Sequence, residues 1–151
     1  MSKNNFEIET LLRAWESGSR DSGFLSGTDY PANQISIVEA LGEIGDTQAI
    51  KPLVKFLRER PHHIEIEYIW PPVERMIADS LHKIMIRHKE NIATPFLLDI
   101  ASLKDMVVSY WPFREGEGEL DYRFGKEQSE LSFSKIRQLA QEELNRRDTT
   151  I

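Results

Sequence analysis

The residues best suited to chemistry lie in the segment 61–68, which reads PHHIEIEY. Alternate side chains of an extended strand point to the same face, so His63, Glu65 and Glu67 would project together. One imidazole with two carboxylates can hold zinc or iron. The spacing matches no strong metal motif, however, and a polar connection between two helices explains the same residues. We therefore expect no metal site, and His62, His63 and the two glutamates remain the centre of an alternative, metal-dependent interpretation.

The chain offers no other arrangement that is suited to catalysis. It contains no cysteine, which excludes disulfides, thiolate zinc sites and cysteine nucleophiles. It also lacks a glycine-rich phosphate loop and a nucleophile elbow. We expect a protein that is not an enzyme, has no catalytic residues and needs no cofactor.

Aromatic side chains are concentrated in residues 104–130, KDMVVSYWPFREGEGELDYRFGKEQSE. Exposed Trp, Tyr and Arg often anchor protein interfaces, and the acidic string at 115–119 would steer a basic partner. The predicted partner-binding residues are Trp70, Tyr110, Trp111, Phe113, Arg114, Glu115, Glu117, Glu119 and Tyr122. The alternative is that these aromatic residues fold back and close the hydrophobic core.

The elements that must position these residues are mainly helical. Residues 40–53, ALGEIGDTQAIKPL, place two glycines and a proline in the strongest amphipathic pattern of the chain. Because Gly costs about 1 kcal/mol and Pro about 3 kcal/mol in a helix interior, two helices that meet at a corner are favoured. We expect Gly45 to end the first helix, Asp46 to cap the next element, and the regular helix to begin near Pro52 after a tight turn. Gly42 would let a neighbouring helix approach closely.

The same pattern returns about forty residues later in the sequence. Leu41 and Leu81 are 40 positions apart, and Pro52 and Pro95 are 43 positions apart. A period in this range indicates a stack of helical hairpins. The sequence ALGEIGDTQAIKPLVKFL resembles the HEAT-like repeat of the type found in phycobilisome lyases, and the second copy is more degenerate.

The resemblance implies an all-α fold, a short right-handed α-solenoid, which we expect to form one domain over residues 1–151. The expected elements are a helix at 5–16, repeats at 35–59 and 72–103, an insertion at 104–130 and a capping helix at 132–147. The capping helix is atypical because one face of a terminal solenoid element meets water. Within residues 106–125 we expect a small β-hairpin that pairs MVVSYWPF with ELDYRFG, or an irregular insertion.

Charge and hydrophobicity restrict the partners. The formal net charge of −6 weighs against nucleic acid, whose phosphates need a basic surface, and is compatible with a basic protein partner. No apolar run is long enough to span a bilayer, and the N-terminal sequence lacks the pattern of a signal peptide. We expect a cytoplasmic protein without a membrane partner.

The sequence thus predicts a non-enzymatic protein–protein interaction module that binds a protein or peptide, as a monomer or a weak homodimer. A sharper version is an immunity or inhibitor protein that neutralises a basic toxin. The alternatives are a metal-dependent enzyme, a lyase and a purely structural homo-oligomer. The lyase alternative is a fold-level analogy that is based only on the resemblance of the repeat to that of the phycobilin lyases.

Overall fold

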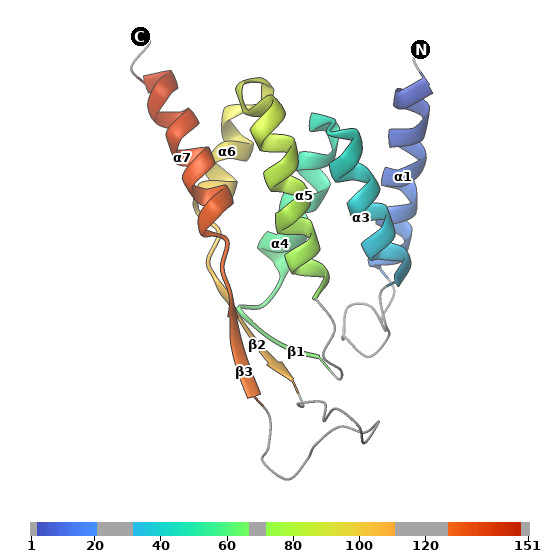
Figure 1. Ribbon diagram of the computed structural model, residues 1–151, viewed down its shortest axis with the longest axis vertical. Helices are drawn as coiled ribbons and strands as arrows, with labels where there is room; N and C mark the ends of the chain where they lie inside the picture. The colour runs from blue at the N-terminus through green and yellow to red at the C-terminus, as the bar shows by residue number, and fades with distance from the viewer. Residues whose placement is uncertain (1–2, 21–31, 67–71, 111–126, 149–151) are drawn as a thin grey trace.

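The computed structural model describes residues 3–20, 32–66, 72–110 and 127–148. These residues form a mostly helical protein with a small sheet (Figure 1). The elements are α1 (Lys3–Ser19), α3 (Ala32–Ile44), the 3₁₀ turn η1 (Thr47–Ala49), α4 (Ile50–Glu59), β1 (His63–Ile66), α5 (Val73–His88), the 3₁₀ turn η2 (Lys89–Asn91), α6 (Thr94–Ala101), β2 (Met106–Tyr110), β3 (Glu127–Leu131) and α7 (Ser134–Asp148).

The helices lie in two layers (Figure 1). One layer contains α1, α3, α5 and α7 in that order, with each helix in contact with the next. The other layer contains α4 and α6, which contact each other. The apolar residues predicted from helical spacing, such as Leu41, Leu53, Leu81 and Ile100, are buried in one hydrophobic core.

The sheet lies beyond one end of the helical layers, with the strand order β1-β2-β3 (Figure 1). β1 is parallel to β2, with Ile64 opposite Val108, and β3 is antiparallel to β2. The inner face of the sheet buries Ile64, Met106, Val108 and Leu131 in the helical core. The expected all-α class therefore omits part of the fold, because side chains of the three-stranded sheet contribute to the hydrophobic core.

The first strand of the predicted β-hairpin is confirmed over Met106–Tyr110. Among the described residues its antiparallel partner is Glu127–Leu131, and the predicted partner segment ELDYRFG at 119–125 lies outside the described residues. Four of the five residues of β3 are exposed, and only Leu131 is buried. β3 consequently lacks the alternation of polar and apolar residues by which a strand is recognised.

The corner between α3 and α4 has the predicted construction. Gly45 has a φ of 73° and follows the last residue of α3, which is the left-handed conformation that glycine adopts at a helix end. The Asp46 carboxylate accepts a hydrogen bond from the Gln48 backbone N–H at 2.8 Å. η1 is the predicted tight turn, and α4 begins at Ile50, so that Pro52 falls in its first turn.

α3 and α5 are in close contact at Gly42. A Cβ atom on Gly42 would lie 2.7 Å from Ser80 Oγ and 3.0 Å from Ser80 Cα. Ser80 Oγ also donates a hydrogen bond to the Val38 carbonyl at 2.8 Å. The absence of a side chain at Gly42 therefore permits the contact, as predicted, and the Ser80 hydroxyl adds a hydrogen bond to it.

Two arginines, Arg87 near the end of α5 and Arg147 near the end of α7, bind backbone carbonyls near the corners α3–α4 and α5–α6. Arg87 on α5 donates to the Glu43 carbonyl at 3.0 Å, beside Gly45. Arg147 on α7 donates to the carbonyls of Lys89 and Ile92, at 3.2 and 2.8 Å, in and next to η2. Both corners thus have carbonyl groups bound by the next helix of the layer.

Glu143 holds the second of these arginines in place. Its side chain is 1% exposed and accepts hydrogen bonds from Arg146 Nε at 2.9 Å and Arg147 Nε at 3.0 Å. The hydrogen bonds from Arg146 and then Arg147 lower the pKa of Glu143 from 4.5 to about 2. A buried carboxylate is tolerated here because both arginines compensate its charge.

Gly42→Ala should destabilise the protein. Ala is normally better than Gly in a helix interior by about 1 kcal/mol, but here the new Cβ would clash with Ser80, and we expect a loss of about 1–3 kcal/mol. Urea unfolding measures the change. The loss should be smaller in a Ser80→Gly background, and a more stable Gly42→Ala variant would contradict the close contact.

Glu143 should make stability sensitive to acid. Its folded pKa is below the unfolded value, so its contribution, on the order of 3 kcal/mol, is present above pH 4.5 and is lost as the pH falls towards about 2. Urea unfolding at a series of acidic pH values should show a weaker pH dependence for Glu143→Gln than for wild type. The exposed neighbour Glu142 supplies the control, because Glu142→Gln should retain the wild-type pH dependence.

Candidate functional site

Only one of the predicted partner-binding residues falls in the described part of the chain. Tyr110 ends β2, opposite Glu127, and its hydroxyl donates to Glu127 Oε2 at 3.2 Å. Burial and the neighbouring carboxylate raise the pKa of Tyr110. The other predicted residues, which lie outside the described residues, are Trp70, Trp111, Phe113, Arg114, Glu115, Glu117, Glu119 and Tyr122.

The residues of the metal-dependent interpretation lie on or next to β1. His63 and Glu65 are exposed and alternate along the strand, as predicted for one face, while Glu67 lies outside the described residues. His63 Nε2 is 2.6 Å from Ser109 Oγ on β2. Among the residues that the structure describes, no three potential metal ligands come together.

The His63–Ser109 pair resembles the base and nucleophile of a hydrolase in its separation alone. Ser109 is only 2% exposed, however, and its side chain projects from the face of the central strand of the sheet. Its Oγ is therefore poorly accessible to a substrate carbonyl. The pair is best explained as a side-chain hydrogen bond that joins β1 to β2.

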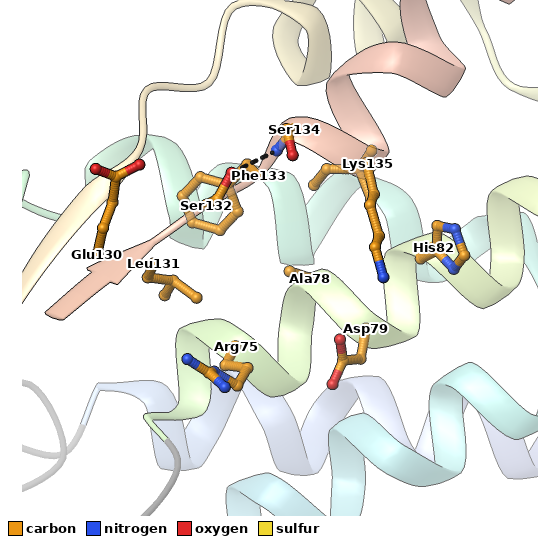
Figure 2. Close-up of a pocket in the computed structure, with 11 residues that line it drawn as sticks. Arg75, Ala78, Asp79, His82, Glu130, Leu131, Ser132, Phe133, Ser134 and Lys135 are labelled. Carbon is orange, nitrogen blue, oxygen red and sulfur yellow. Dashed lines mark hydrogen bonds between the residues drawn. The ribbon is translucent and has the colours of Figure 1, made fainter.

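A surface hollow of about 340 Å³ lies where α5, the end of β3 and the start of α7 meet (Figure 2). Its polar or charged lining residues are Arg75, Asp79, His82, Glu130, Ser132, Ser134 and Lys135, and its apolar ones are Ala78, Leu131, Phe133 and Ile136. Figure 2 shows Lys135 extending from α7 towards α5 on the side of Asp79 and His82. Residues more than fifty positions apart in the chain thus share one surface.

α5 contributes the charged wall of this hollow. Arg75, Asp79 and His82 occupy positions i, i+4 and i+7, which lie on one helix face. Within the described ranges, the side chains of these residues and of Lys135 form no hydrogen bond or ion pair. These groups are therefore available to a ligand outside the fold.

A second hollow, of about 360 Å³, lies on the other side of α5, against α3. It shares Asp79 and His82 with the first and adds Glu39, Met76 and the ion pair between Lys83 and Glu43. α5 is therefore a ridge with a hollow on each side. We call this surface the α5 ridge; it consists of Arg75, Asp79, His82 and Lys135 with the lining of both hollows.

The chemistry of the α5 ridge favours binding over catalysis. It offers cations, a carboxylate and an imidazole at the surface, which suit polar and charged groups of a partner. Ser132 Oγ accepts a hydrogen bond from the Ser134 backbone N–H at 3.2 Å, at the start of α7. This surface was not among the sites predicted from the sequence. Helical spacing alone would place Arg75, Asp79 and His82 together, but the proximity of Lys135 depends on how α7 returns to α5.

The His63–Ser109 hydrogen bond should contribute about 1 kcal/mol to stability, as is typical of a hydrogen bond within a protein. A double-mutant cycle of His63→Ala and Ser109→Ala, followed by urea unfolding, isolates this term. The two substitutions should be coupled by about that amount. Strictly additive effects would show that the pair does not join the strands.

Comparison with known proteins gives no relative from which to transfer a function. No protein-family model matches the chain, and no curated protein or solved structure matches it. No helix in the described ranges has both the length and the apolar character required to cross a bilayer. The function must therefore be argued from the geometry of this chain.

Proposed function

We propose that this protein is a non-enzymatic protein–protein interaction module, built as a short right-handed α-solenoid of HEAT-like hairpins. The partner, a protein or peptide, binds across the α5 ridge. The observation that carries this proposal is a set of four side chains without an ion-pair or hydrogen-bond partner among the described residues: Arg75, Asp79, His82 and Lys135. All four line the first hollow, and Asp79 and His82 also line the second.

The solenoid part of the proposal is supported by the repeated construction of the hairpins. In each, a longer helix is followed by a 3₁₀ turn and a shorter helix: α3, η1 and α4, then α5, η2 and α6. In each, an arginine of the next helix in the layer binds a backbone carbonyl near the corner: Arg87 binds that of Glu43 in the last turn of α3, and Arg147 binds that of Lys89 in η2. Repeated contacts between neighbouring units are what a stacked array of hairpins requires.

The use of charge elsewhere in the fold supports the choice of surface. Arg60 pairs with Glu74 at 2.9 Å, and Arg137 pairs with Asp105. Those arginines hold the connections α4–α5 and α6–β2 in place and are unavailable to a partner. Within the described residues, the side chains of Arg75, Asp79, His82 and Lys135 form no such ion pair.

The net charge of −6 supports a basic partner, which the field of the whole protein would attract. The predicted aromatic anchors also remain part of the proposal. Tyr110 and Glu127 are paired on neighbouring strands, so the two strand ends that bracket residues 111–126 lie together at one end of the sheet.

Photo-crosslinking in cells of the source organism tests the partner-binding proposal. Benzoylphenylalanine placed at position 79 or 82 should give a discrete covalent adduct with one protein, whereas the exposed control position Lys104 should not. The absence of an adduct at both ridge positions, or equal adducts at the control position, would contradict the proposal.

The captured protein then allows affinity to be measured. Asp79→Lys should weaken binding about tenfold, because it reverses a charge at the centre of the ridge. Gln141→Lys, a charge change at an exposed position of α7, should leave the affinity unchanged. Urea unfolding of both variants confirms that any loss is not a loss of the fold.

A further inference from the structure

A third hollow lies between α1 and α4, away from the α5 ridge, and it differs from the ridge in size and charge. Its volume is about 750 Å³, roughly twice that of either hollow beside α5. The lining residues are Leu12, Arg13, Trp15, Glu16, Ser19 and Arg20 of α1 and its end, and Lys51, Pro52, Lys55, Phe56 and Glu59 of α4. We call it the α1–α4 groove.

The floor of the α1–α4 groove is aromatic. Trp15 and Phe56 meet edge to face, with ring centroids 5.3 Å apart and an interplanar angle of 76°. Trp15 is 2% exposed and Phe56 9%, so the rings are fixed by the core and offer only their outer atoms to the groove. Leu12 and Pro52 are half-buried beside them. Such a floor favours aliphatic side chains of a ligand.

The rim of the groove is basic, in a chain that is acidic as a whole. Arg20 is paired with Glu16 at 2.5 Å. Arg13, Lys51 and Lys55 are exposed and, within the described part of the chain, have no hydrogen-bond or ion-pair partner. Lys51 and Lys55 are four residues apart on α4, an arrangement of like charges that is unfavourable in an isolated helix. Among the described residues that line the groove, Glu59 is the one carboxylate left to balance these three cations.

We propose that the α1–α4 groove is a docking site for an acidic amphipathic helix of another protein. The aliphatic face of that helix would lie on the Trp15–Phe56 floor, and its carboxylates would pair with Arg13, Lys51 and Lys55. An apolar floor between cationic walls complements an acidic amphipathic helix, which is recognised through its apolar anchors and its flanking charges. This site is separate from the α5 ridge, and its partner has the opposite charge to the one proposed there.

The test uses a fluorescein-labelled synthetic peptide of about four helical turns, with leucines on one face and glutamates on the other. Fluorescence anisotropy should show saturable binding to the wild-type protein that weakens with added salt. Lys51→Glu combined with Lys55→Glu should weaken binding at least about tenfold. Lys104→Glu, which changes a lysine outside the groove, and Asp79→Lys on the α5 ridge should leave it unchanged.

A charge exchange makes the test decisive. A matched peptide with lysines in place of glutamates should bind the Lys51→Glu, Lys55→Glu variant better than it binds wild type. The substituted side chains are exposed, and urea unfolding checks that the variant is folded.

Several results would overturn this proposal. They are no saturable binding up to about 1 mM peptide, equal affinity of the variant and wild type, or equal binding of a scrambled acidic peptide without an apolar face. Self-association that the double variant abolishes would assign the groove to a second copy of the chain. The ridge is tested separately, by crosslinking at positions 79 and 82. A negative result with the acidic peptide would therefore not contradict the proposed function of the α5 ridge.

Discussion

The close contact between Gly42 and Ser80 determines where α5 lies, and much of the described surface depends on it. With no side chain at Gly42, the backbone of α3 comes close to α5, and the Ser80 hydroxyl bonds to the Val38 carbonyl. This contact joins the two predicted hairpins. The two hollows of the α5 ridge flank α5, one towards α7 and one towards α3, and Ser80 itself lines the second.

Charged groups in this protein fall into two sets with different physical roles. Glu74, Asp105 and Glu143 are buried or half-buried and each is paired with arginine, because an uncompensated charge at such positions would be strongly unfavourable. The pairing with Arg137 and the Phe133 backbone N–H lowers the pKa of Asp105, and Glu143 is affected in the same direction. The second set comprises Arg75, Asp79, His82 and Lys135 on the α5 ridge and Arg13, Lys51 and Lys55 around the α1–α4 groove. Within the described residues these side chains form no ion pair, and we propose that they bind partners.

The local chemistry of the chain predicts the helices and their corner well. Gly45, Asp46 and Pro52 act through the backbone of their own neighbourhood, and the structure confirms the role predicted for each. The sheet was harder to predict, because β1 pairs with a strand about forty residues away and β3 has a single buried side chain. The α5 ridge combines residues of α5 with Lys135, whose position depends on tertiary packing. The composition of residues 104–130 favoured a binding site at the aromatic residues instead, and of the residues predicted to bind a partner the structure describes Tyr110.

We propose that this protein binds its partner at the α5 ridge. The most direct measurement is a titration of the isotope-labelled protein with the captured partner, followed by backbone and side-chain NMR signals. We predict that the largest shift changes fall on Arg75, Asp79, His82 and Lys135, with the core residues around Leu53 unchanged. Changes confined to other surfaces, with these four residues unaffected, would contradict the account.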